Sequence, residues 1–262
     1  PSLPRPQYTP RRPLNTRLFR ADRMGESRIF VAGTVPARPS CDMADLMTTH
    51  MRKTASLPID DVAGMLANLG FRTMCGVDEA GRGPLAGPVV AAAVIVPHGF
   101  ALDGLTDSKL MTPAQRDEVF ARIAEAGFPC AVGIIDHETI DRVNILKASL
   151  LAMRRAVMEL PAPPECVIVD GNHTIPNLAF PQYALVHGDR LCPAVSAASV
   201  IAKVTRDRIM DRMERLYPQF RFSQHKGYCT PAHLEELRAH GPCEIHRKSF
   251  GPVAELLQYA LV

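Results

Sequence analysis

Two apolar segments joined by a short glycine-rich connection constrain the fold of this chain more than any other feature. Residues 72–78 and 88–96 are rich in β-branched residues, and each is short enough to form a single strand. Because only the glycine-rich stretch separates them, we predict that they pair as a β-hairpin. Asp78 and Glu79 stand at the expected end of the first strand, so two acidic side chains are predicted at the edge of a sheet.

Extended and helical segments alternate along the rest of the chain, which favours an α/β fold. The helix expected after Thr112 has an N-cap residue followed by Pro113 at its first position. Further strands are predicted at 130–135, 166–170 and 183–186, and helices at about 113–127, 137–140, 145–160, 195–216, 233–239 and 253–260. The segment 219–228 is predicted to be a polar, basic loop.

The composition separates an N-terminal extension from one folded domain. Residues 1–56 are rich in Pro and Arg and lack sustained periodicity, so we predict a disordered extension. With 47% hydrophobic and 22% charged residues, the chain as a whole resembles a globular protein. We therefore predict one domain over 57–262, in which residues 219–262 form a helical C-terminal part.

Membrane insertion and disulfide bonding are both disfavoured. The longest strictly apolar run, 89–96, has eight residues, far fewer than the roughly 20 that a membrane-spanning helix needs. The seven cysteines include no CxxC pair and their number is odd, which excludes a zinc ribbon or a complete disulfide framework. We expect a reducing compartment, the cytoplasm, and no membrane partner.

Two further aspartates stand at expected strand ends. Asp170 ends a buried strand and precedes a glycine, and Asp189 follows a glycine just after the strand predicted at 183–186. Taken singly, an aspartate beside a glycine is typical of a turn. Strand ends can meet at one edge of an α/β sheet, however, and three aspartates together with Glu79 favour a common site there.

Four carboxylates gathered at one place would repel one another unless a cation neutralised them, so the pattern predicts a metal site. All-oxygen ligands suit Mg²⁺ or Mn²⁺ better than zinc. Two such ions about 4 Å apart can polarise a phosphodiester, activate a water molecule and stabilise the leaving oxygen. Residues 190–248 hold 11 basic and 6 acidic residues, which suits a polyanionic substrate but is also typical of solvated helix faces.

Nucleotide-binding loops are disfavoured by their context. The glycines after Glu79 precede a predicted strand, whereas a dinucleotide loop needs a helix N-terminus behind its glycines. The Gly-Lys-Ser/Thr sequence of a phosphate-binding P-loop is also missing there.

Several motifs, in collinear order over about residues 70–252, resemble the type 2 ribonuclease H family, ribonuclease HII of the bacterial type. They are DEAGRGPLAGPVVAAAV at 78–94, DSK at 107–109, VDGN at 169–172, SAASVIAKVTRD at 196–207, HKGY at 225–228 and HGPCEIHRKSF at 240–250. The resemblance implies a ribonuclease H-like mixed sheet flanked by helices, with a small helical C-terminal part.

The resemblance also implies an endoribonuclease. Such an enzyme hydrolyses the RNA strand of RNA/DNA hybrids and nicks duplex DNA 5′ to embedded ribonucleotides, leaving 5′-phosphate and 3′-hydroxyl ends. By the same resemblance Asp78, Glu79, Asp170 and Asp189 are the catalytic carboxylates that bind Mg²⁺ or Mn²⁺. We expect a monomer that acts on hybrids and on ribonucleotide-containing duplex DNA, with a sliding clamp as a candidate protein partner.

Substrate contacts are likewise assigned by resemblance. Gly81, Arg82 and Gly83 are expected to read the ribose 2′-hydroxyl, the group that distinguishes RNA from DNA, and glycine allows close approach of the backbone to a sugar. Tyr228 is expected to stack under the sugar that follows the ribonucleotide. Candidate contacts to phosphate are Lys109, Lys203, Arg206 and Lys226, for which a solvated charge is an equally good interpretation, and Ser108 and Ser196 are candidate hydrogen-bond donors to the substrate.

Some positions depart from the family pattern, and two other functions remain in view. His187 and Arg190 flank the loop of Asp189 where the family commonly has other residues, and Cys229 replaces a usual glycine. A junction resolvase on the same fold is disfavoured by the Gly81–Gly83 motif and Tyr228. A protein that binds hybrids without cleaving them would have lost acidic residues, and all four are present.

Overall fold

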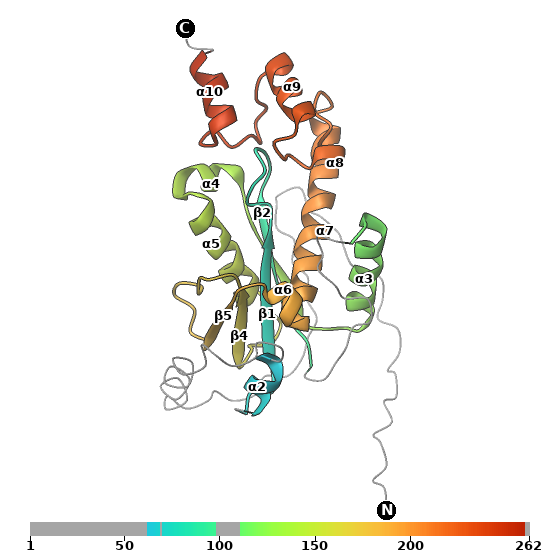
Figure 1. Ribbon diagram of the computed structural model, residues 1–262, viewed down its shortest axis with the longest axis vertical. Helices are drawn as coiled ribbons and strands as arrows, with labels where there is room; N and C mark the ends of the chain where they lie inside the picture. Colours follow the sequence, from blue (N-terminus) through green and yellow to red (C-terminus); the bar gives the residue numbers. More distant parts are fainter. Residues whose placement is uncertain (1–61, 69, 98–110, 260–262) are drawn as a thin grey trace, which may run out of the picture.

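The computed structural model describes residues 62–68, 70–97 and 111–259 (Figure 1). A five-stranded sheet in the order β3-β2-β1-β4-β5 forms its centre. β1 pairs antiparallel with β2 and β2 antiparallel with β3, whereas β1–β4 and β4–β5 are parallel pairs. The strands are β1 (Met74–Ala80), β2 (Val89–Ile95), β3 (Cys130–Ile135), β4 (Cys166–Asp170) and β5 (Gln182–Leu185). The predicted hairpin and the mixed sheet are therefore confirmed.

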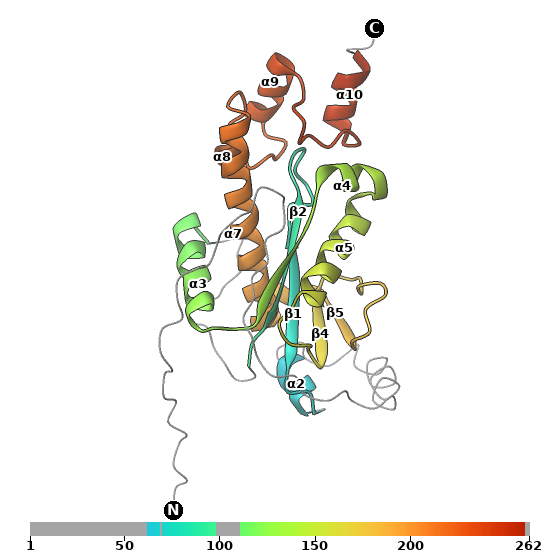
Figure 2. The same ribbon diagram turned by 180° about the vertical axis from the view of Figure 1, so that it is seen from behind.

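Two helices cover the two faces of this sheet, as Figures 1 and 2 show from opposite sides. α7 (Pro193–Leu216) packs on one face and α5 (Ile145–Met158) on the other. β2 is buried along its whole length, so Ala92 and Val94 join the core beneath α7 while Ala91 and Ala93 join the core beneath α5. Apolar side chains on both faces of a strand require this double cover.

The remaining helices surround this three-layer arrangement. α3 (Pro113–Glu125) lies beside α7 and begins with the predicted cap, because the Thr112 hydroxyl accepts from Gln115 N and the Gln115 side chain accepts from Thr112 N. The others are α2 (Val62–Asn68), α4 (His137–Val143), α6 (Gly188–Leu191), α8 (Phe222–His225), α9 (Pro231–His240) and α10 (Gly251–Tyr259).

The C-terminal helices form a small part of their own at one end of the sheet (Figure 1). Phe220, Phe222, Leu237 and Val253 are buried there against Met210 of α7, together with two residues of the β1–β2 connection. The segment 219–228 is thus not the polar loop that its composition predicts. Its two phenylalanines enter a core, while most of its polar residues and Tyr228 stay exposed.

The first strand also runs further than expected. β1 continues to Ala80, so Asp78 pairs with Ala92 and Glu79 with Ala91 inside the antiparallel ladder. The strand was expected to end at Asp78 and instead ends at Ala80, because the pairing with β2 extends beyond the point where the parallel partner β4 ends. Beyond the end of β4, β1 is paired only with β2 among the described strands, and Asp78 and Glu79 lie at this point.

Part of the prediction falls where the structure is not described. The extension expected at 1–56 and the candidate contacts Ser108 and Lys109 lie outside the described residues. Within 62–68, 70–97 and 111–259, no helix combines the length and the apolar character needed to cross a membrane.

Candidate functional site

Two of the predicted acids are neighbours across the parallel pair of strands. Val77 of β1 is in register with Val169 of β4, so the next residues, Asp78 and Asp170, lie side by side at the end of β4. Asp78 is paired with Ala92, which belongs to the core beneath α7, so both aspartates face the α7 side of the sheet. The mixed topology therefore brings together residues 92 positions apart.

The third aspartate comes from the short helix that follows β5. Gly188 N donates a hydrogen bond of 2.7 Å to Asp170 Oδ1, and Asp189 is the next, buried residue. The backbone turns into α6 through His187, whose φ of 60° is left-handed. A Cβ at position 188 would lie 3.2 Å from Asp170 Oδ1, so a glycine allows this close approach. The His187 departure thus falls on the turn that delivers Asp189.

The environment of Asp78 disfavours its negative charge. Its side chain is buried, and burial raises the pKa of the Asp78 carboxyl, with further increases from the charges of Glu79 and Asp170. Hydrogen bonds from the Ser199 hydroxyl and from Glu79 N, the latter 2.7 Å long, act in the opposite direction but do not reverse the shift. The site accordingly holds more negative charge than the protein compensates.

This donor set fits a hard divalent cation. The four acids offer only oxygen ligands, which Mg²⁺ and Mn²⁺ prefer, and a cation would remove the penalty that raises the pKa of Asp78. Across the described part of the chain, no three His, Cys, Asp or Glu side chains are already gathered in a position to hold an ion. Glu79 pairs with Ala91, which belongs to the core beneath α5, so its side chain leaves β1 on the opposite face from Asp78.

The glycine-rich connection and Tyr228 lie against each other, as their expected joint role requires. A Cβ at Gly83 would be 3.7 Å from Cε1 of Tyr228, and Leu85 N donates to Gly227 O over 2.7 Å. The Tyr228 side chain is 42% exposed although its neighbours are largely buried. An exposed aromatic ring beside backbone that lacks side chains is a suitable surface for a sugar.

Two buried arginines hold this connection in place. Arg206, 1% exposed, donates to the carbonyl oxygens of Ala86, Pro88 and Lys226 over 3.0–3.1 Å. The structure thus gives Arg206 a different role from the predicted phosphate contact, because its guanidinium is already satisfied inside the protein. A Cβ at Gly81 would lie 2.1 Å from Arg206 Nε, so glycine at this position, whose φ is 98°, makes room for the arginine.

Arg247 is the second arginine, and the residue-level predictions did not include it. It is 0% exposed and donates to the carbonyls of Gly81, Arg82 and Gly87 over 2.6–3.0 Å. The only signal in the sequence is its place within the C-terminal motif at 240–250. Ser199 was missed in the same way, inside the motif at 196–207.

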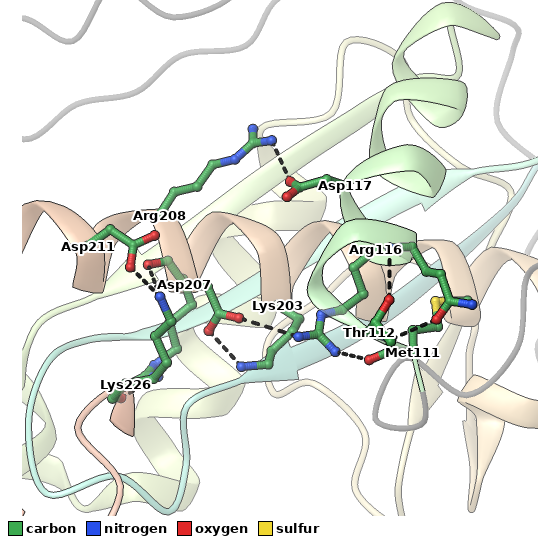
Figure 3. A network of polar contacts seen from close by, with 11 residues as sticks. Met111, Thr112, Arg116, Asp117, Lys203, Asp207, Arg208, Asp211 and Lys226 are labelled. Atoms are coloured by element: carbon green, nitrogen blue, oxygen red, sulfur yellow. Dashed lines mark hydrogen bonds and ion pairs between the residues drawn. The ribbon is translucent and has the colours of Figure 1, made fainter. Parts of the chain in front are cut away.

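Two of the predicted basic contacts, Lys203 and Lys226, line a groove between α3, α7 and α8 that Tyr228 also lines. Figure 3 shows the polar contacts of these two lysines. Lys203 Nζ lies 2.6 Å from Asp207 Oδ1, and Lys226 pairs with Asp211. The groove is further lined by Arg116, Asp117 and Arg208, and Arg208 Nη2 contacts Asp117 Oδ1 at 2.8 Å. Its cations are therefore paired with carboxylates, which a phosphate would have to displace.

Ser196 lies on the buried side of α7. Its hydroxyl has no hydrogen-bond partner and is covered by protein. Arg82, by contrast, is half exposed and lies 3.4 Å from Glu79 Oε1 through its Nη1. The structure therefore presents Arg82, but not Ser196, on the surface beside the acids.

Comparison with known proteins agrees with this arrangement. A family model described as Ribonuclease HII matches residues 75–253. The Ribonuclease HII of Geobacter sulfurreducens is 49% identical over 197 residues, which are 75% of this chain and 90% of that protein.

Two solved structures are similar in fold. The PCNA:RNase HII complex from Archaeoglobus fulgidus matches with a TM-score of 0.55 and 26% identity, over 68% of this chain and 95% of the other. Bst-RNase HIII in complex with Mn²⁺ matches with a TM-score of 0.58 and 22% identity, over 74% of this chain and 72% of the other. The ribonuclease H-like fold expected from the sequence is confirmed.

Proposed function

The chain belongs to the ribonuclease HII family and is an endoribonuclease of RNA/DNA hybrids, and from this premise we propose that it also nicks duplex DNA 5′ to single embedded ribonucleotides. The expected products carry a 5′-phosphate and a 3′-hydroxyl. The observation that carries the proposal is the contact between the Gly81–Gly83 connection and the exposed Tyr228 ring, next to the strand that bears Asp78 and Glu79.

We propose that Asp78, Glu79, Asp170 and Asp189 hold divalent cations, Mg²⁺ or Mn²⁺. Their support is the lateral pairing of Asp78 with Asp170 and the raised pKa of Asp78, which indicates uncompensated charge. Bst-RNase HIII, a protein of the same fold, is known in complex with Mn²⁺, which agrees with this choice. When bound, such ions polarise the scissile phosphodiester and activate water. The chain's own contribution is to place Asp78 and Asp170 side by side at the end of β4, with Asp189 directly after Gly188, which binds Asp170, and Glu79 next along β1.

Substrate selection is proposed to depend on the surface beside these acids. The backbone of Gly83 is exposed, whereas Gly81 is held by Arg206 and Arg247 beneath it, and the Arg82 side chain is half exposed. Tyr228 offers its ring to the sugar that follows the ribose. A ribose 2′-hydroxyl can hydrogen bond to backbone groups here, and deoxyribose lacks that group.

We also propose a protein partner, an oligomeric state and a cellular compartment for this chain. One solved relative is a complex with PCNA, which supports a sliding clamp as a candidate partner of this chain. All predicted site residues belong to one chain, so we propose a monomer. The six cysteines within the described ranges are free thiols, which agrees with a reducing compartment such as the cytoplasm. The family model begins at residue 75, so we propose that residues 1–56 are dispensable for cleavage.

The test is cleavage of four labelled substrates by the purified full chain. These are duplex DNA with one ribonucleotide, the same duplex without it, a long RNA/DNA hybrid and a branched all-DNA junction, each with Mg²⁺, Mn²⁺ or a chelator. We expect metal-dependent nicking 5′ to the single ribonucleotide and no cutting of all-DNA duplex. Cleavage of the hybrid alone would refute the single-ribonucleotide proposal, and cutting of a branched all-DNA junction would favour the resolvase. Equal cleavage in chelator would refute the metal proposal.

A further inference from the structure

Three histidines lie buried in the C-terminal part, away from the acidic residues. His225, His233 and His246 sit among Phe220 and Phe222, and the rings of His225 and His233 stack with centroids 4.1 Å apart. Imidazole nitrogens are costly to bury without partners, and all six ring nitrogens here have one. The partners determine where the ring protons lie.

The direction of the bonds can be derived from the backbone carbonyl of Tyr228. This oxygen can only accept, so His233 Nδ1, 2.9 Å away, carries the proton. In a neutral ring His233 Nε2 is then an acceptor, and the bond of 3.0 Å to His246 Nε2 requires a donor there. His246 Nδ1 is left as an acceptor and accepts from Cys243 N over 3.0 Å, so Cys243 O, 3.2 Å from the same nitrogen, receives no proton from it. One chain of bonds runs from Cys243 to Tyr228.

The third ring holds the other side of the same peptide. Gly227 N donates to His225 Nδ1 over 3.1 Å, so His225 Nε2 carries the proton and faces Glu236 Oε2 at 2.9 Å. Glu236 is held in turn by Arg221, whose Nε lies 2.6 Å from Glu236 Oε1. Two stacked imidazoles therefore bind the amide of Gly227 and the carbonyl of Tyr228.

This arrangement needs uncharged imidazole rings, and burial favours the uncharged form of His233 and His246. Desolvation lowers the pKa of His233, and desolvation with the neighbouring His233 lowers the pKa of His246 to about 4. The rings act on a segment with unusual backbone, because Lys226 and Gly227 both have positive φ, 51° and 80°. Such backbone persists where its surroundings hold it.

We propose that His225 and His233 are positioning residues that fix the backbone of Gly227 and Tyr228, so that the exposed Tyr228 ring stands against the Gly81–Gly83 connection. His246 orients His233 by donating to it. The inference rests on the proposed function of Tyr228 in recognising the ribonucleotide. It assigns a role in substrate selection to a buried cluster that does not touch the acids, although one edge of His225 lines the groove that ends at Tyr228.

The proton positions are tested on the unmodified chain. In a two-bond ¹H–¹⁵N correlation spectrum at neutral pH, with each ring assigned by a single substitution, His233 should show the Nδ1–H tautomer, whereas His225 and His246 should show the Nε2–H tautomer. An Nε2–H tautomer at His233, or a charged ring at any of the three positions, would overturn the arrangement.

The effect on function is tested by a double-mutant cycle on duplex DNA with one ribonucleotide. His233→Phe keeps the ring shape without hydrogen bonds and should raise KM roughly fivefold, about 1 kcal/mol, with little change in kcat. His233→Asn, whose amide can still donate to the Tyr228 carbonyl, should recover part of that loss. In a Tyr228→Ala background, His233→Phe should have no further effect. His240→Phe, an exposed position on α9, serves as the matched control.

The outcomes separate the inference from its premise. If Tyr228→Ala cleaves this substrate as the wild type does, the role of Tyr228 is refuted and the inference falls with it. If Tyr228→Ala is impaired but His233→Phe costs the same factor in both backgrounds, only the inference is refuted. If His233→Phe does not fold, the inference is tested by the tautomers of the wild type and by the KM of His233→Asn compared with that of the wild type.

Discussion

Among single residues, Asp78 tests the proposed metal site most directly, because its charge is needed to neutralise a cation. We expect Asp78→Asn to reduce cleavage by at least about 100-fold, in the range of losses for a group that acts on the transition state, while hybrid binding is largely retained. The amide keeps the shape of the carboxyl but cannot neutralise a cation. Turnover in Mg²⁺ and affinity for a labelled hybrid are the two measurements, and turnover close to wild type would contradict the proposed metal site.

The same substitution has a predicted effect on stability. A carboxyl whose pKa is raised in the folded state binds its proton more tightly there, so its contribution to stability falls as pH rises above the unfolded value of 3.8. Metal-free Asp78→Asn should therefore melt at a higher temperature than the wild type at pH 7, and the difference should shrink as the pH is lowered. Adding Mn²⁺ should raise the melting temperature of the wild type more than that of the variant. A variant that melts lower at pH 7 would contradict this reasoning.

Tyr228 carries the prediction that distinguishes the substrates. Stacking on an aromatic ring contributes about 1–3 kcal/mol, so Tyr228→Ala should slow nicking at a single ribonucleotide by about tenfold or more. Cleavage of a long hybrid should suffer less, because it offers many alternative registers. The rates on both substrates are compared, with Tyr217→Ala, a tyrosine bonded to Glu244 instead, as a control. Equal losses on both substrates would exclude the junction role.

At the scale of elements, the periodicity of the sequence predicts the strands and long helices because they bury apolar faces. It places the start of α7 two residues late and misses α6, since a four-residue helix has no period to detect. It also misjudges 219–228, where the buried Phe220 and Phe222 are outnumbered by polar neighbours. The parallel pairing of β1 with β4 joins segments far apart in the chain, so the local sequence pattern does not predict it.

β1 packs closely against α7, and this contact is testable at one glycine. A Cβ at Gly76 would lie 2.1 Å from Ala194 C and 2.2 Å from Val195 N, both backbone atoms. Gly76→Ala should therefore separate the strand from the helix, lower stability by roughly 2–3 kcal/mol and reduce cleavage. Gly251→Ala, where a Cβ meets nothing within 4 Å, is the control. Urea unfolding measures both, and equal stability of the two variants would contradict the contact.

At the scale of the whole molecule, the sequence offers candidate residues for the chemistry but not the contacts that support them. The four acids are proposed from their places beside strands, and the register of β1 with β4 and the bond between Gly188 and Asp170 relate three of them in space. Arg206 and Arg247 were not predictable in their observed roles, because an arginine in a sequence suggests solvent or phosphate. Only the packed chain shows that their partners are backbone carbonyls.

The C-terminal part is consequently a structural component of the site, and Arg247 tests this. Leu85 O accepts from Arg247 N, Gly87 N donates to Ile245 O, and the Arg247 side chain binds three carbonyls of the same connection. Arg247→Met fills similar space but leaves those carbonyls without their donor, so we expect a loss of about 2–4 kcal/mol in unfolding free energy. Cleavage at a single ribonucleotide should fall below what the unfolded fraction explains, because the Gly81–Gly83 backbone is no longer held. Arg238→Met, on the exposed side of α9, should change neither quantity. A destabilised Arg247→Met that cleaves normally per folded molecule would show that the connection keeps its shape without the C-terminal part.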